Sequence, residues 1–248
     1  MKRNFLVSSL VTIALFGMFF ISCKKSSGSV SPSYKCTGCI TTPEAVAAND
    51  NSSKGIYKGI IVGSSGTIKF DIMNSDATIK AYMVVDGVSD TLTASVAWVS
   101  GVSYVSAFTG TFNGQAVSIT MSLDANGGNP TITAMNIPGH PNATLTISKE
   151  TSSNLVECFE GTYTNATTGK NGTLNLIISP GLNKWYGQAR ETGSGSSQNM
   201  VGTISNNTLS YDDGHGFTVT GTLSGDQTNG TWKDSQPENG TWTAKRTL

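Results

Sequence analysis

Two carboxylates and an imidazole come together at Asp212, Asp213 and His215. Such groups can act as general acid and base or hold a metal ion, so a hydrolase that uses these three residues is one interpretation. The pair Asp213-Gly214 is also typical of a tight hairpin turn, and we expect a turn here. The sequence contains no serine-hydrolase, zinc-peptidase or phosphate-binding motif. We therefore assign no catalytic residue, no metal site and no cofactor.

Three cysteines, Cys36, Cys39 and Cys158, offer a second kind of chemistry. The C-x-x-C spacing of the first two suits a structural disulfide, a redox-active dithiol or part of a metal site. The strand-helix-strand pattern of a redox fold does not surround them, and an exported chain favours a structural disulfide. Because three thiols cannot all pair within one molecule, one stays free or pairs between molecules. Cys158 is a further candidate partner that would pin the N-terminal segment.

Aromatic residues are the remaining candidates for binding. Trp185 and Tyr186 are adjacent, so in a strand they point to opposite faces, and we expect one of them to be exposed. An exposed aromatic ring can stack on a sugar or on a partner protein. Trp232 and Trp242 alternate as inward strand residues, and we expect them in the core.

Composition indicates that strands must position all of these residues. Only 13% of the residues are charged, and Gly, with 28 residues, Thr, Ser and Asn take their place. This composition disfavours long helices and favours strands joined by turns. One short helix is expected at residues 42–48, with Thr42 as N-cap and Pro43 in its first position. The sequence predicts an all-β protein.

The strand pattern forms an internal repeat that occurs twice in the sequence. Gly55-Ile56-Tyr57 matches Gly161-Thr162-Tyr163 at an offset of 106, and later matches follow at offsets of 100 and 97. Many strands contain a Gly-Thr-apolar triplet, in which we expect Gly to serve a turn, Thr to face solvent and the third residue to face the core. Asn-Gly and Asp-Gly pairs separate the strands, which therefore form antiparallel hairpins. We predict two tandem antiparallel β-meander repeats, each barrel-like or sandwich-like.

The N-terminus has the pattern of an export signal. Lys2 and Arg3 precede the apolar stretch 5–21, and Cys23 follows it. The run Phe20-Ile21-Ser22-Cys23 resembles the lipobox of bacterial lipoproteins. That resemblance implies cleavage before Cys23 and fatty acylation of its thiol, which would hold the protein to a membrane. We expect a signal peptide at 1–22, a flexible tether with the short helix at 23–53, and the β repeats at 54–152 and 153–248.

Together with the Gly-Thr-aromatic repeats that end at residues 240–246, this leader is similar to uncharacterised lipoproteins of the Bacteroidetes type. The resemblance implies a lipid-anchored protein of the cell envelope, at the outer membrane, and names no activity. Lys24 and Lys25 leave open whether it faces the periplasm or the cell surface.

The net charge of the chain excludes one further class of function. Removing the leader takes away two basic residues, so the net charge becomes 14 − 16 = −2. A near-neutral chain lacks the broad basic face that nucleic-acid binding needs. We expect a membrane-anchored, non-enzymatic module that binds a glycan or an envelope protein. A barrel that carries a small apolar ligand and the hydrolase described above are the alternatives; the carrier would show inward-facing Gly, Ala and Ser in place of large core residues.

Overall fold

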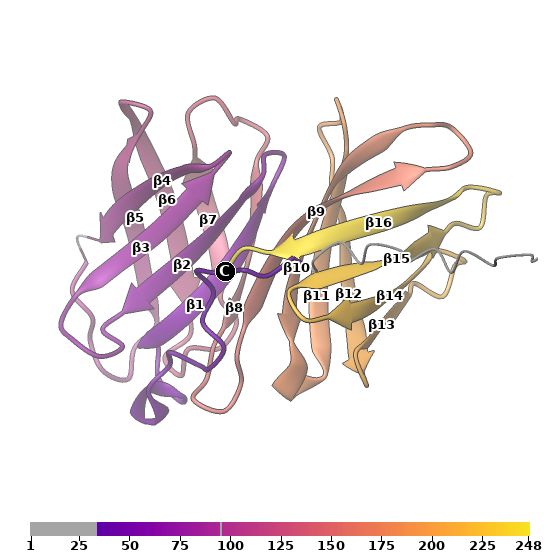
Figure 1. Cartoon of the computed structure of the whole chain (residues 1–248). Coiled ribbons are helices and arrows are strands. Elements are labelled where there is room, and N and C mark those ends of the chain that lie inside the picture. Colours follow the sequence, from indigo (N-terminus) through magenta and orange to yellow (C-terminus); the bar gives the residue numbers. More distant parts are fainter. Residues whose placement is uncertain (1–33, 95) are drawn as a thin grey trace, which may run out of the picture. The chain divides into compact units, whose positions relative to one another are not determined.

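The computed structural model describes residues 34–94 and 96–248, and it is all-β. Residues 33–248 belong to one compact unit that contains two eight-stranded antiparallel sheets (Figure 1). The prediction of two related, barrel-like β repeats is therefore confirmed. The predicted leader, the predicted acylation site Cys23 and residues 24–33 of the tether lie outside the described residues.

The first sheet is a meander whose last strand returns beside its first. Its order is β7-β6-β5-β4-β3-β2-β1-β8, and β7 and β8 form its two edges. Side chains on one face form an apolar core that includes Phe70, Phe108, Phe112 and Met121. The strands are β1 (Gly55–Val62), β2 (Gly66–Ile72), β3 (Ile79–Val85), β4 (Val88–Ala94), β5 (Tyr104–Phe112), β6 (Gln115–Leu123), β7 (Thr131–Asn136) and β8 (Thr144–Lys149).

The second sheet has the same strand sequence but closes completely. Strand β9 pairs with both β10 and β16, so every strand of this barrel has two neighbours. The strands, drawn from orange to yellow in Figure 1, are β9 (Glu157–Asn165), β10 (Asn171–Ser179), β11 (Lys184–Glu191), β12 (Gln198–Ser205), β13 (Thr208–Asp212), β14 (Thr218–Ser224), β15 (Gln227–Lys233) and β16 (Asn239–Arg246). A 3-10 turn, η2 (Pro180–Leu182), joins β10 to β11.

The triplet glycines lie in strands rather than in turns, which corrects the expectation that they serve turns. Gly202, Gly221 and Gly240 lie in β12, β14 and β16, and their φ angles are not positive. A Cβ atom added at Gly221 would come within 2.2 Å of the Trp242 ring, and one at Gly202 within 2.3 Å of Trp185. These glycines are required because aromatic rings lie directly against their backbone: Trp185 comes from β11, next to β12, and Trp242 reaches β14 from β16, two strands away.

The expected helix at 42–48 is also wrong. A single 3-10 turn, η1 (Ala47–Asn49), forms instead, and Val46 before it is extended. The backbone N–H groups of Glu44 and Val46 donate to the side chains of Glu150 and Asn74. Because distant side chains bind these amides, the segment is held extended and cannot close a helical turn.

A buried ion pair joins the first sheet to its flanking segments. Lys58 in β1 and Glu150 after β8 are both fully buried, and Nζ and Oε2 lie 2.6 Å apart. The Glu150 carboxylate also accepts hydrogen bonds from the backbone N–H groups of Glu44 (2.6 Å), Ala45 (3.3 Å) and Val156 (3.1 Å). One carboxylate thus fixes the N-terminal segment, β1 and the approach to β9.

The end of the barrel at which β16 finishes is plugged. Arg246 is buried there, with Nη1 2.7 Å from Glu157 and 3.6 Å from Asp226. The N-terminal segment covers this cluster: the Tyr34 hydroxyl donates to the Arg246 carbonyl (2.8 Å), and the Cys36 N–H donates to Asp226 (2.9 Å). The opposite end, where β9 finishes and β16 begins, is where a cavity opens.

Candidate binding site at the open end of the second barrel

A cavity of about 520 Å³ occupies the unplugged end of the second barrel. Volumes of this order hold small organic ligands. Its wall is formed by inward residues near the ends of the strands and by the connecting turns. The lining residues are Tyr163, Asn165, Leu174, Ala189, Glu191, Ser194, Ser196, Ser197, Gln198, Met200, Asp213, Phe217, Val219, Trp232, Asp234, Glu238 and Trp242.

Three aromatic rings form one side of the cavity. The Trp232 ring centroid lies 6.2 Å from that of Tyr163 and 6.2 Å from that of Phe217. The Trp232 indole N–H donates to the backbone carbonyl of Thr164 at 3.1 Å. Since that bond uses the indole's single donor, Trp232 can offer a ligand its ring but no N–H.

Glycines keep these rings against the wall. A Cβ atom added at Gly172 would lie 2.6 Å from the Tyr163 ring, and one added at Gly240 would lie 2.5 Å from the Trp232 ring. Each ring therefore occupies the space that a side chain on the next strand would otherwise fill. This arrangement leaves room in the lumen. Gly221 of the second repeat corresponds to Met121 of the first repeat, 100 residues earlier. Met121 is buried in the apolar core of the first sheet.

The lining is acidic. Glu191, Asp213, Asp234 and Glu238 contribute carboxylates from the end of β11 and from two turns, and none of the described lining residues is Lys, Arg or His. Glu191 forms an ion pair with Lys170 (2.9 Å), and Glu238 accepts a hydrogen bond from the Asn165 amide (2.8 Å). The whole chain has equal numbers of acidic and basic residues, so this excess of negative charge is local.

Two pKa shifts agree with this charge. Burial, together with the Glu191 carboxylate, raises the pKa of Tyr163, so its hydroxyl stays neutral. Hydrogen bonds from the backbone N–H groups of His215 and Phe217 hold the pKa of Asp213 below its usual value, so its carboxylate stays ionised. The cavity therefore combines neutral aromatic faces with permanent negative charge.

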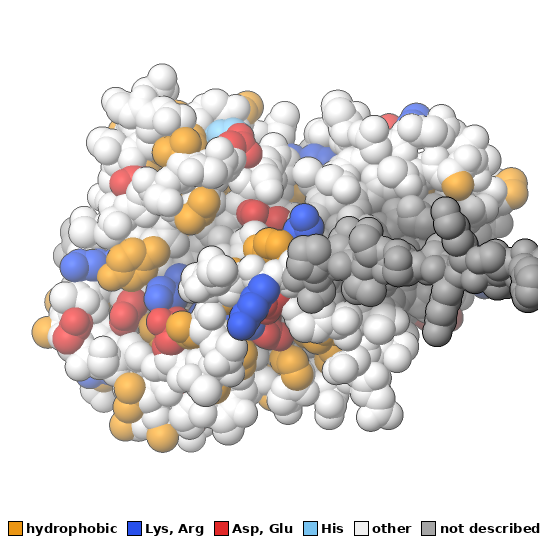
Figure 2. Space-filling view, viewed as in Figure 1, with side chains coloured by type: hydrophobic (Ala, Val, Ile, Leu, Met, Phe, Trp, Pro, Cys, Tyr) orange, Lys and Arg blue, Asp and Glu red, His pale blue; other side chains and the backbone are white. Residues whose placement is uncertain are grey.

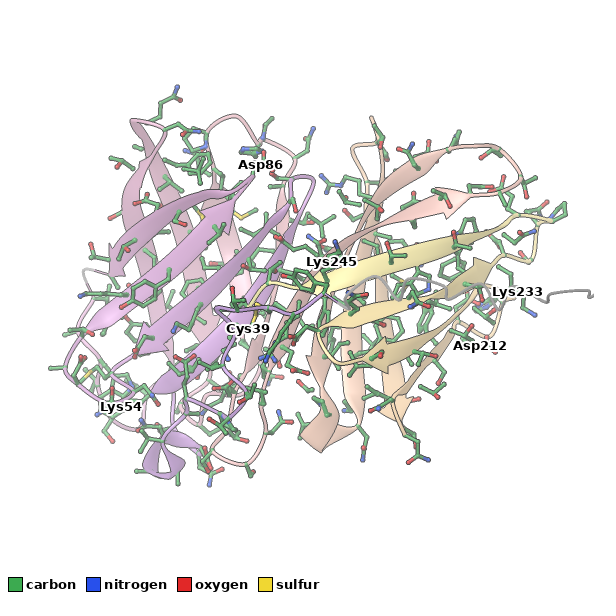
Figure 3. All side chains as sticks on the ribbon, viewed as in Figure 1. Cys39, Lys54, Asp86, Asp212, Lys233 and Lys245 are labelled. Carbon is green, nitrogen blue, oxygen red and sulfur yellow. A yellow bond between two sulfur atoms is a disulfide. The ribbon has the colours of Figure 1, made fainter. Side chains whose placement is uncertain are left out.

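The residues of the hydrolase hypothesis form a turn. Asp212 accepts a hydrogen bond from the Gly214 N–H (2.8 Å), and Asp213 accepts one from the His215 N–H (2.7 Å). The His215 ring nitrogen Nδ1 lies 2.9 Å from the Asp213 carbonyl oxygen and not against a carboxylate. Asp213 borders the cavity, whereas Asp212 and His215 are exposed. Figure 3 labels Asp212 in this region of the second barrel, as well as Lys233 on β15.

Metal binding finds no support in the same geometry. In the part of the chain that the structure describes, no three His, Cys, Asp or Glu side chains are arranged to hold a metal ion. The carboxylates of the cavity are distributed around it and do not converge on one point.

Trp185 is not a surface residue, which corrects its prediction as a binding residue. It is fully buried in the second barrel, and its indole N–H donates to the Ser210 carbonyl (3.2 Å). Tyr186 points to the other side of β11, is partly buried, and packs against a small cluster around Ile60 and Ile177. Adjacent strand residues do point to opposite faces here, but neither ring is freely exposed, because the outer face of β11 is partly covered.

The three cysteines within residues 34–248 form one disulfide and leave one thiol unpaired. Cys36 and Cys39 form a disulfide, while Cys158 is free and fully buried. The idea that Cys158 pins the N-terminal segment covalently is therefore wrong. Hydrogen bonds from that segment to Asp226 and Arg246 hold it in place instead.

Sequence reasoning missed the cavity because it placed Trp232 and Trp242 in the core and the triplet glycines in turns. Trp242 is buried, as expected, but it also forms part of the cavity wall. Trp232 is only partly buried. The signal that would have revealed the cavity is the run of inward glycines on successive strands, at 172, 187, 202, 221, 230 and 240.

The outer surface has mixed character. On the face shown in Figure 2, acidic and basic side chains are interspersed with single hydrophobic ones. Within the described ranges, no helix is both long and apolar enough to cross a bilayer.

Comparison with known proteins adds little. No family model matches the chain, and no curated protein matches it significantly. A crystal structure of a protein of unknown function from the DUF3598 family of Nostoc punctiforme PCC 73102 covers 79% of this chain and 94% of its own, at 8% identity and a TM-score of 0.21. This similarity is too low to carry a structural or functional argument.

Proposed function

We propose that the chain is a binding module that holds a small organic ligand in the open end of its second barrel. The observation that carries the proposal is the aromatic-walled cavity of about 520 Å³ in a barrel plugged at its other end. Concave sites of this kind bury much of the surface of a small ligand. The proposal follows the carrier alternative from the sequence, because inward glycines do line this barrel.

In this proposal the first repeat has a supporting role. Its inner face is filled by large residues such as Phe70, Phe108 and Met121, whereas the second repeat places glycines and a cavity in the corresponding space. Acylation of Cys23 and attachment to the outer membrane of the cell envelope remain part of the proposal. They are supported by the leader sequence alone.

A neutral fluorescent probe tests the binding function. The chain from Ser33 onward contains all sixteen strands that the structure describes and forms one compact unit, so it can be titrated without the leader. We expect N-phenyl-1-naphthylamine, an uncharged dye that brightens in apolar surroundings, to bind it with one saturable site. The indole rings of Trp232 and Trp242 should transfer excitation energy to the bound dye.

A matched pair of variants locates the site. Ala189→Phe adds a ring to the cavity wall and should abolish dye binding, because the new ring occupies the lumen. Val201→Phe adds the same ring to the exposed outer face of the neighbouring strand β12 and should leave binding intact. Dye binding that survives Ala189→Phe with unchanged affinity, or no saturable binding to the parent chain, would contradict the proposal.

A further inference from the structure

The charge and the aromatic faces of the cavity specify what kind of ligand it accepts, and this inference rests on the proposed function. We propose that the site binds an organic cation, a ligand whose ammonium group sits against the Tyr163, Phe217 and Trp232 rings. The argument has three steps: the faces that the rings present, the charge around them, and the size of the space.

Aromatic faces attract cations. The face of an aromatic ring carries negative electrostatic potential, and Trp gives the strongest such contact. Here Trp232 contacts a second ring on each side, so one surface of the cavity presents three rings from β9, β15 and the segment before β14. The ring planes of Tyr163 and Trp232 are 86° apart, and the Trp232 N–H, already bound to Thr164, is not available to a ligand.

The charge of the surrounding side chains determines which sign of ligand charge the cavity favours. Two cations lie close to the four carboxylates of the lining: Lys170, which pairs with Glu191 from a 59% exposed position, and the buried Arg190, whose Nε donates to the hydroxyl of the lining residue Ser197 (2.8 Å). Counting both cations leaves an excess of two negative charges around the cavity (4 − 2 = 2). An anion would be repelled, and a neutral ligand could accept no Coulombic attraction of this kind, although its O–H or N–H groups could donate hydrogen bonds to the carboxylates.

The geometry favours an organic cation over a metal ion. A divalent ion needs several oxygen ligands converging within about 2.0–2.6 Å. The lining carboxylates do not converge in this way, and two of them, Asp213 and Glu238, already accept hydrogen bonds from the protein. Distributed charge around an aromatic wall suits the diffuse charge of an alkylammonium group, whose methyl or methylene groups pack against the rings.

Two probes of nearly equal shape isolate the contribution of charge. The 3-hydroxyphenyltrimethylammonium cation and 3-tert-butylphenol differ by nitrogen in place of one carbon and by the resulting charge. Each would be titrated against the dye-loaded chain from Ser33 onward, with displacement followed by fluorescence. We expect the cation to bind about tenfold more tightly or better, the size of one well-desolvated cation–π contact. Its affinity should fall as salt is added, and that of the phenol should not.

Charge-neutral variants test the residues. Asp234→Asn and Glu191→Gln remove charge from partly or fully exposed positions, while Asp213→Asn and Glu238→Gln retain the oxygen that accepts the local hydrogen bond. We expect the combined variant to bring the affinity ratio of the two probes close to one without weakening the phenol. Trp232→Leu should reduce the ratio, and Trp232→Phe should retain most of it.

The possible results separate the two claims. If the dye binds and the two probes displace it equally well, the cation inference is overturned and the binding function stands. If an anion such as 3-hydroxybenzoate displaces the dye best, the inference is likewise overturned. If no dye binds at all, the proposed function fails and the inference fails with it.

Discussion

Replacing Lys58 with Met tests whether the buried ion pair holds the N-terminal half together. The change removes the ammonium group 2.6 Å from Glu150 and leaves a fully buried carboxylate. Losing one partner of a buried pair costs about 3–5 kcal/mol. Three backbone N–H groups still donate to that carboxylate, so we expect the lower end, about 3 kcal/mol. For a unit of this size, that loss corresponds to a fall in melting temperature of roughly 6–12 °C.

Urea unfolding of the chain from Ser33 onward, followed by tryptophan fluorescence and circular dichroism, measures the loss. Coincident transitions from the two signals are needed before a free energy is derived. Lys233→Met is the control, because Lys233 is exposed on β15, and it should change the free energy of unfolding by less than about 0.5 kcal/mol.

A second substitution separates charge from packing. In Lys58→Met with Glu150→Gln, the glutamine oxygen can still accept from the Glu44 and Ala45 N–H groups, the bond from the Val156 N–H is lost, and the buried carboxylate charge is removed. We expect the double variant to recover at least about half of the lost stability. A single variant that loses less than about 1 kcal/mol, or a double variant less stable than the single one, would refute the reasoning.

Two further predictions concern titratable groups. Burial raises the pKa of the Cys158 thiol to about 12, so at pH 8 Ellman's reagent should leave the folded chain from Ser33 onward unmodified and label one thiol after unfolding in urea. Rapid labelling of this folded chain would contradict the buried placement. Burial also raises the pKa of Glu160 above its usual 4.5, so the folded state keeps a proton that the unfolded state releases. The free energy of unfolding should therefore fall as the pH rises from about 4.5 through the raised pKa. In urea titrations between about pH 4 and 7, Glu160→Gln should flatten this dependence on pH. An unchanged slope in the variant would argue against a raised pKa of Glu160.

The fold follows from short-range patterns that the sequence displays directly. Ile68, Phe70 and Ile72 alternate on one face of β2, and all three are buried. The matches at offsets of 106 and 97 fall on equivalent strands, as for Tyr57 in β1 and Tyr163 in β9. The second sheet closes into a barrel, whereas the first keeps two open edges. This difference depends on pairing between strands far apart in the sequence, which no local pattern specifies.

The candidate binding cavity was harder to predict than the fold, because its position depends on which space inside the barrel the side chains leave unfilled. A Gly-Thr-Trp triplet is compatible with a Trp that fills the core and with a Trp that lies flat against a neighbouring glycine. Gly240 and Trp232 are eight residues apart, and their contact follows from the pairing of β15 with β16. Likewise, the exposure of Trp185 or Tyr186 could not be read from alternation, since the barrel interior buries the first and packing outside β11 partly covers the second.

The plugged end of the barrel is also the end at which a tether would be attached. Tyr34 and Cys36 contact the cluster around Arg246, at the finish of β16, and the cavity opens at the start of that strand. Eight residues of strand span about 25 Å, so the entrance and the attachment point are a full barrel height apart. If the proposed acylation of Cys23 anchors the chain at this end, the entrance would stay accessible from the surrounding solution, and ligand exchange would not require release of the anchor.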